Sequence, residues 1–73
     1  MLLREYVGEA IRSERQSIGL TLRDVADPAG ISFGYLSEIE TGRKEPSSEI
    51  IEAILQSLGI GMPELIDAVA AMC

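Results

Sequence analysis

Histidine and tryptophan are absent from this chain, and cysteine occurs once, at position 73. Without histidine, the sequence lacks the commonest general base and the commonest zinc ligand. It also has no glycine-rich phosphate loop, no His-Glu-x-x-His segment and no Gly-x-Ser-x-Gly nucleophile turn. Carboxylate pairs such as Glu38 and Glu40 could in principle do acid–base work, but solvated or structural carboxylates explain them better. We therefore predict that the protein is not an enzyme and has no metal or cofactor.

Long apolar runs are also missing. The longest, residues 68–73, is far shorter than the roughly 20 residues that a membrane span needs. Charged residues follow Leu3 too early for a signal peptide. The single Cys73 cannot form an intramolecular disulfide, which suits a reducing compartment; it is either a free end or a link between two subunits. We predict a cytoplasmic protein without membrane contact.

Aromatic residues are few, so aliphatic side chains must form the core. The chain of 73 residues, 47% apolar and 25% charged, has the composition of a globular protein. A chain this short buries only about 60% of its unfolded surface. We predict one domain over residues 1–73, whose last helix extends to a dimer interface.

Apolar residues recur every three or four positions, which predicts helices throughout and no strand. Thr21, Ser32 and Ser47 are residue types that cap helix N-termini, and glycines follow four of the predicted helices. Pro28 lacks an N–H and crowds the preceding turn, so the second helix is expected to end or bend near Asp27. The five helices are expected at about 3–18, 22–27, 33–41, 48–58 and 62–72.

The second and third predicted helices are joined by a short turn containing Gly30, which is typical of a helix-turn-helix unit. Ala26, four residues before this glycine, is small enough to let the two helices approach closely. Apolar residues occupy the positions that must face inward. These residues are Val25, Ala29, Ile31, Leu36 and Ile39.

From Val7 to Leu65 the sequence resembles the Cro/repressor-like (Xre) helix-turn-helix family of transcription regulators. The matching stretches are Val7-Gly8-x-x-Ile11-Arg12, Arg15, Gly19-Leu20-Thr21, Ile31-Ser32, Tyr35-Leu36-Ser37-x-Ile39-Glu40-x-Gly42, Pro46-Ser47 and Leu58-Gly59-Ile60. Within the family, MLLRE and GYLSEIETGRKEPSSE are most similar to the actinobacterial regulators of Clp-protease genes. The resemblance implies an all-α, five-helix, lambda-repressor-like DNA-binding domain. Its helix-turn-helix unit consists of helices 2 and 3.

The resemblance implies that residues 33–41 enter the major groove of double-stranded DNA. It places base contacts at four positions on the outer face of this helix: Phe33, Gly34, Ser37 and Glu38. The phenyl ring would pack on a thymine methyl group, and the carboxylate would accept from cytosine N4. Two alternatives remain open: packing of Phe33 into the core, and a solvated charge at Glu38.

Phosphate contacts are expected to fix the register on DNA. The resemblance implies Arg43 and Lys44 in the loop after the third helix. Thr21, at a helix N-terminus, is a further candidate through its amide and hydroxyl groups. The remaining candidates are Thr41 and Arg12, with Arg23 as a weaker one.

Two further features follow from the resemblance. Leu22 stands where the family often has a glutamine that contacts phosphate, so one anchor is missing. Arg15 and Glu40 match a structural ion pair between the first helix and the end of the third.

The net charge of −6 is unusual for a DNA-binding domain. However, Arg12, Arg15, Arg23, Arg43 and Lys44 all lie in or just after the first three helices. Glu49, Glu52, Glu64 and Asp67 lie in the C-terminal half, so the two charges are expected to be separated. Weak binding by each subunit favours a homodimer on a pseudo-palindromic operator.

The last helix offers an apolar stripe for this dimer, consisting of Ile66, Val69 and Met72. Alternatively, the stripe folds back on its own domain. A different function is also possible: a protein-interaction module, anti-regulator or antitoxin-like, that does not rely on DNA. Asp24 and Asp27 are candidates for contact with RNA polymerase.

Overall fold

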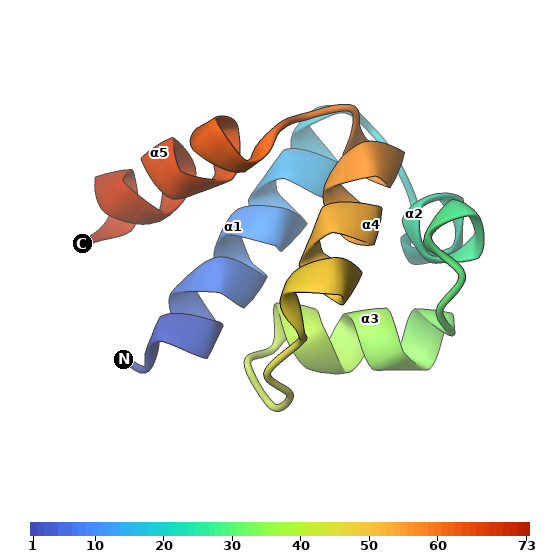
Figure 1. Cartoon of the computed structure of the whole chain (residues 1–73), viewed down its shortest axis with the longest axis horizontal. Helices are drawn as coiled ribbons and strands as arrows, with labels where there is room; N and C mark the ends of the chain where they lie inside the picture. The colour runs from blue at the N-terminus through green and yellow to red at the C-terminus, as the bar shows by residue number, and fades with distance from the viewer.

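The computed structural model describes all residues, 1–73, and contains five helices and no strand. The helices are α1 (Leu3–Ser17), α2 (Leu22–Ala29), α3 (Phe33–Glu40), α4 (Ser48–Leu58) and α5 (Met62–Met72). The predicted all-α class is confirmed. Figure 1 shows α1 between α5 on one side and α3 on the other, with both chain ends at the α5 end of the molecule.

Side-chain caps start three of the helices where the sequence predicts them. The hydroxyl of Ser32 accepts a hydrogen bond from the amide of Tyr35 at 3.0 Å, and that of Ser47 accepts one from Ile50 at 3.2 Å. Thr21 caps α2 in the same way. Each cap satisfies an amide that has no partner inside its helix.

The second helix was expected to end or bend near Asp27; it does not end there, because α2 continues through Pro28 to Ala29. Proline removes only one amide, and here it is the next-to-last residue of the helix, so little of the hydrogen-bond ladder is lost. Gly30, at φ +74°, then closes the helix. The amide of Ile31 donates to the carbonyl of Ala26 at 3.1 Å, a C-terminal closure that favours glycine.

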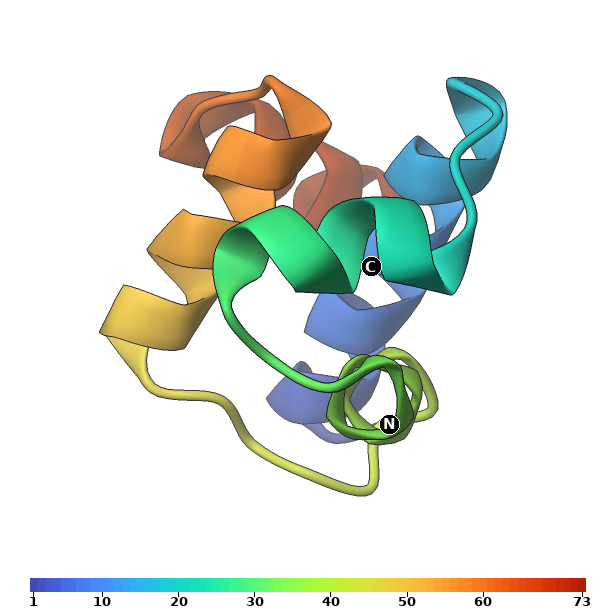
Figure 2. The ribbon, with the colours of Figure 1, turned by 90° about the vertical axis from the view of Figure 1, so that its right-hand side faces the viewer.

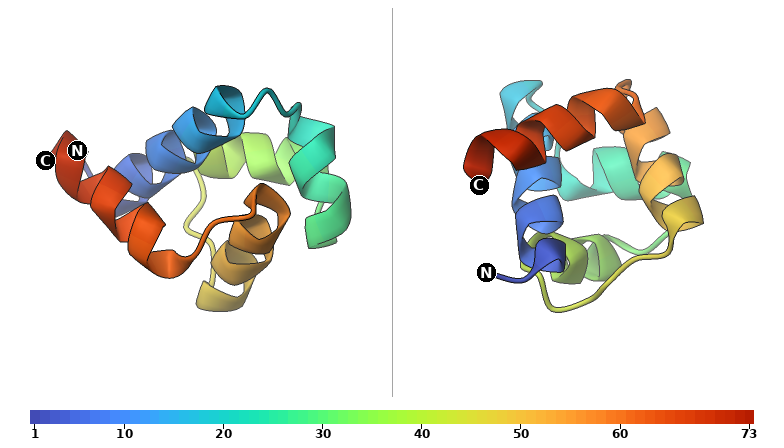
Figure 3. Two further views of the ribbon diagram at one scale, coloured as in Figure 1. Left: turned by 90° about the horizontal axis from the view of Figure 1, so that it is seen from above. Right: turned by 60° about the vertical axis from the view of Figure 1, so that its left-hand side comes forward.

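The core is wholly aliphatic, and it draws on every helix. Its members, each less than 9% exposed, are Ala10, Ile11, Val25, Ala26, Leu36, Ile39, Ile54, Leu55, Leu58 and Leu65. Helix α1 packs against both α3 and α5, and α2 packs against α3 and α4. Figure 3 shows the same arrangement from two further sides, with α5 beside α1. The position of α3 is thus set by two other helices.

No single helix is long and apolar enough to cross a membrane. Helices α4 and α5 meet the length and composition requirements only as a pair, and they are bent by 98° relative to one another.

Contact between α1 and α3 is unusually close at Gly8. A Cβ atom at this position would overlap the carbonyl oxygen of Ile39 and lie 2.9 Å from that of Glu40. On the same side of α1, the Nε of Arg4 donates to the carbonyl of Gly42 at 3.0 Å. The backbone at the end of α3 therefore rests directly on α1.

Candidate nucleic-acid interface

Helix α3 is fixed by its inner face and open on its outer face. Leu36 and Ile39 are completely buried. On the outer face, Phe33 is 46% exposed, and a Cβ atom at Gly34 would meet no atom within 4 Å. In Figure 2, α3 is seen end-on beneath α2, at the border of the molecule. Because no part of the chain covers this edge, it is free to contact a ligand.

The four predicted base-contacting residues lie on this open side of α3. Phe33 and Gly34 are exposed, whereas Ser37 and Glu38 are half-buried. Gly34, Ser37 and Glu38 follow Phe33 by one, four and five residues, which places all four on one helix face. They are grouped as a DNA-reading surface requires.

Phe33 does not pack into the core, so that alternative is wrong. Its ring instead lies beneath the guanidinium of Arg23, with 4.3 Å between the guanidinium carbon and the ring centroid. Cation–π contacts at exposed sites contribute about 0.5–1 kcal/mol. Sequence reasoning missed this pair, because the two residues are brought together only by the crossing of α2 and α3.

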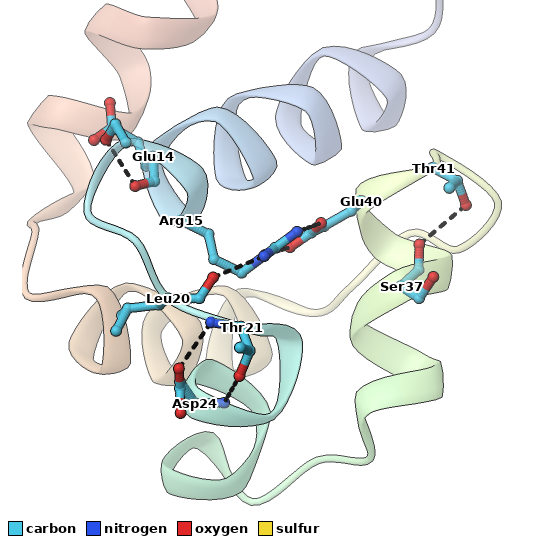
Figure 4. A network of polar contacts seen from close by, with 9 residues as sticks. Glu14, Arg15, Leu20, Thr21, Asp24, Ser37, Glu40 and Thr41 are labelled. Atoms are coloured by element: carbon cyan, nitrogen blue, oxygen red, sulfur yellow. Dashed lines mark hydrogen bonds and ion pairs between the residues drawn. The ribbon is translucent and has the colours of Figure 1, made fainter.

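The ion pair between Arg15 and Glu40 forms and links α1 to the end of α3 (Figure 4). The Nε and Nη2 atoms donate to the two carboxylate oxygens at 2.8 and 3.0 Å. The Nη1 atom donates to the carbonyl of Leu20 at 2.8 Å. The hydrogen bonds to the Glu40 carboxylate raise the pKa of Arg15, while its partial burial opposes the rise. Both side chains are largely buried, at 11% and 4% exposure, so the pair holds the helix and does not read bases.

Thr21 and Thr41 both use polar groups within the protein (Figure 4). The amide of Thr21 donates to the carboxylate of Asp24 at 2.8 Å, which lowers the pKa of Asp24. The Thr21 hydroxyl accepts from the amide of Asp24 at 3.1 Å, so only its hydrogen remains available for a phosphate. The Thr41 hydroxyl donates to the carbonyl of Ser37 at 3.1 Å and must rotate to contact DNA.

The remaining phosphate candidates lie around α3. Arg43 and Lys44 are exposed in the loop just after it. Arg12 lies on α1 and shares a shallow depression of about 230 Å³ with Ser37, Thr41 and Leu22. The structure therefore brings predicted base and phosphate contacts from three helices to one side.

The charges are unequally distributed along the chain. Residues 1–44 contain all six lysines and arginines and seven of the twelve acidic residues. Residues 45–73 contain the other five acidic residues and no basic one, so they carry −5 of the net charge of −6. Residues 1–44, which contain α1 to α3, therefore carry only −1, so most of the negative charge lies in the C-terminal segment.

The predicted dimer stripe borders an apolar groove. Ile66 is 58% exposed, whereas Val69 and Met72 are half-buried against the core. The groove has a volume of about 340 Å³ and is lined only by apolar residues: Leu3, Val7, Ile51, Met62, Leu65, Ile66, Val69 and Ala70. Sequence analysis missed the contribution of α1 and α4 to this surface, because it considered α5 alone.

The geometry of α2 and α3 defines a helix-turn-helix DNA-binding fold, and residues 11–65 match the family model described as Helix-turn-helix. The chain belongs to this family.

Three similar proteins, all named as regulators, show which members of the family this chain resembles. The chain is 56% identical over 68 residues to the transcriptional regulator ClgR of Mycobacterium tuberculosis, covering 92% of this chain and 61% of that protein. It is 41% identical over 61 residues to the regulator DdrOP3 of Deinococcus deserti, covering 84% of this chain and 47% of that protein. The crystal structure of the clp gene regulator ClgR from Corynebacterium glutamicum is similar at a TM-score of 0.95 and 43% identity, covering 99% of this chain and 77% of that one.

These comparisons confirm the predicted family and the similarity to regulators of clp genes. They also agree with the prediction that the domain is not an enzyme. The chain spans about three-fifths of the length of the M. tuberculosis relative and about half of that of the D. deserti relative.

Proposed function

We propose that this domain is a sequence-specific, DNA-binding transcription regulator that inserts α3 into the major groove. The observation that carries the proposal is the outer edge of α3, which is uncovered at Phe33 and Gly34. Behind this edge, Leu36, Ile39 and the ion pair of Arg15 hold the helix rigidly. A rigid, accessible helix is what base reading in the major groove requires.

Phosphate contacts would come from both ends of this surface. Arg43 and Lys44 follow α3, and Arg12 lies beside Thr41 on the α1 side. Thr21 begins α2, whose N-terminal end favours an anion. A cytoplasmic location follows from the proposed target, chromosomal DNA.

We further propose that the domain binds a pseudo-palindromic operator as a homodimer through the apolar groove and Ile66. An apolar surface of this kind on so small a domain is costly to leave in water. The groove is lined by Leu3 and Val7 of α1 and by no residue of α3, so that a second copy would leave the DNA-reading edge free. Two such helices would meet half-sites about 34–36 Å apart.

The test is a mobility shift with genomic fragments at two salt concentrations, about 50 and 200 mM. If the protein makes six or more phosphate contacts, raising the salt concentration from about 50 to about 200 mM should lower its affinity for DNA about 10³-fold or more. The R43A/K44A double variant should weaken binding and reduce this dependence. The matched control E64Q changes a charge on α5 and should leave the dependence unchanged.

The acidic composition also suits a protein-interaction module that does not rely on DNA. A high-affinity partner protein together with no salt-dependent DNA shift would favour that function and refute the regulator.

The second helix offers a surface for RNA polymerase, since Asp27 is exposed near the DNA-facing side. We propose that its carboxylate contacts a basic polymerase surface. The D27A variant should then lower transcription while DNA affinity stays the same. The control D67A, on α5, should change neither, and an equal loss of affinity and transcription in D27A would contradict the contact.

A further inference from the structure

Arg23 and Phe33 form a stacked pair at the N-terminal edge of α3. The guanidinium lies 4.3 Å from the ring centroid, and both residues are exposed. Arg23 makes no hydrogen bond or ion pair with another residue of the chain, so all of its donors remain free. The pair therefore presents an unused guanidinium held in place by an aromatic ring.

The position of the pair favours base contact over contact with phosphate. The ring holds the guanidinium against α3, the helix proposed to enter the groove, and not along the outer side of α2. Gly34 follows Phe33 and has open space in place of a side chain, so base edges can approach. Leu22, which precedes Arg23, cannot bond a phosphate and gives α2 no anchor there.

The two groups complement two neighbouring bases. Successive bases in one strand are about 3.4 Å apart, and the guanidinium carbon lies 4.3 Å from the ring centroid, so the two groups can face neighbouring bases. Arginine donates two hydrogen bonds to guanine O6 and N7, the commonest specific contact, and phenylalanine packs on the C5 edge of a pyrimidine. A pyrimidine followed by a purine is also the most easily deformed step in DNA.

We propose that Arg23 and Phe33 act together to recognise a pyrimidine–guanine step in each half-site. Arg23 donates to the guanine, and the free edge of Phe33 packs on the pyrimidine C5 position. This inference rests on the proposed DNA-binding function, and it adds Arg23 to the residues that determine specificity.

The test begins with selection of duplexes from a random library by the unmodified protein. Selected half-sites should share a pyrimidine–guanine step. Affinities are then measured for duplexes in which that guanine is replaced by 7-deazaguanine, and for pairs that differ only in a methyl group on the pyrimidine C5. R23A, F33L and K44A are compared with the unmodified protein, and thermal unfolding confirms that each variant is folded.

R23A should bind the selected duplex at least about fivefold more weakly, the loss expected for a bidentate contact, but the 7-deazaguanine duplex almost as well as the unmodified protein does. F33L should lose the effect of the C5 methyl group. K44A should weaken binding to all duplexes alike.

Two results would overturn the inference in different ways. Equal losses for R23A on every duplex would assign Arg23 to a phosphate and leave the regulator function intact. Failure of the unmodified protein to select any duplex would refute the regulator function itself, and this inference with it.

Discussion

At the scale of single residues, Gly34 is the most informative position. It lies in the first turn of α3 and leaves open the space that a side chain would fill. A Cβ atom there would meet nothing within the protein. Its backbone is helical, so glycine has no conformational advantage at this position. We propose that its value lies outside the chain, in the close approach of DNA.

The G34A variant should be more stable by up to about 1 kcal/mol, since alanine favours a helix. It should nevertheless bind DNA more weakly, because the new methyl group occupies the space of a base edge. Urea unfolding and mobility shifts measure the two effects. G19A is the matched control: at φ +76° alanine is strained, so stability should fall while affinity per folded molecule stays the same. Unchanged DNA affinity in G34A would remove this residue from the interface.

Features that depend on neighbouring residues are the ones that the sequence predicts well. The caps at Thr21, Ser32 and Ser47 form as predicted, because each joins groups three residues apart. The contact of Arg23 with Phe33 was not predictable, because it requires the angle between two helices. The value of Gly8 was missed for the same reason, although the residue stood in a recognised pattern.

At the scale of helices, the contact between Gly8 of α1 and the backbone at the end of α3 is critical for stability. In G8A, the methyl group would overlap backbone atoms of Ile39 and Glu40, which cannot rotate away. We expect a loss of about 3 kcal/mol or more from this overpacking, despite the better helix propensity of alanine. Thermal and urea unfolding would show it. Stability equal to that of the unmodified protein would mean that α1 and α3 can separate without cost.

The ion pair between Arg15 and Glu40 makes a separate prediction. Removing one partner, as in E40A, leaves a largely buried charge unpaired and should cost about 3–5 kcal/mol. Replacing both, as in R15M/E40L, removes the charge together with its partner and should cost less than E40A. Urea unfolding of R15M, E40L and R15M/E40L measures the coupling between the two side chains. Additive losses would show that the two side chains act independently.

Boundaries of helices were the least predictable part at this scale. Pro28 was expected to end or bend α2 near Asp27, but the helix continues through it to Ala29, where Gly30 supplies the closing geometry. The sequence shows a strong helix breaker and a strong helix closer two residues apart. Only the folded backbone shows which of the two sets the boundary.

At the scale of the whole molecule, the structure separates two surfaces. The edge of α3 carries Phe33, Gly34, Ser37 and Glu38 and lies near basic residues, whereas the groove beside Ile66 is lined only by apolar residues. The stripe on α5 was predicted from its periodicity. Its continuation onto α1 and α4 was not, because it depends on how three helices meet.

The I66E variant should be monomeric in sedimentation velocity, because a carboxylate cannot be buried cheaply in an apolar interface. Its operator affinity should fall at least about tenfold. I18E is the matched control: Ile18 is also about half exposed, at 50%, but does not line the groove. Dimers that persist in I66E would place the interface elsewhere.

Gly8 also affects how two copies would be spaced. Helix α1 touches the backbone of α3 at Gly8 and lines the apolar groove with Leu3 and Val7, so one helix connects the two surfaces. No flexible connection separates them. In a pair of these domains, the distance between the two α3 helices would therefore be fixed by the rigid body of the protein. That distance would set the number of base pairs between the two half-sites.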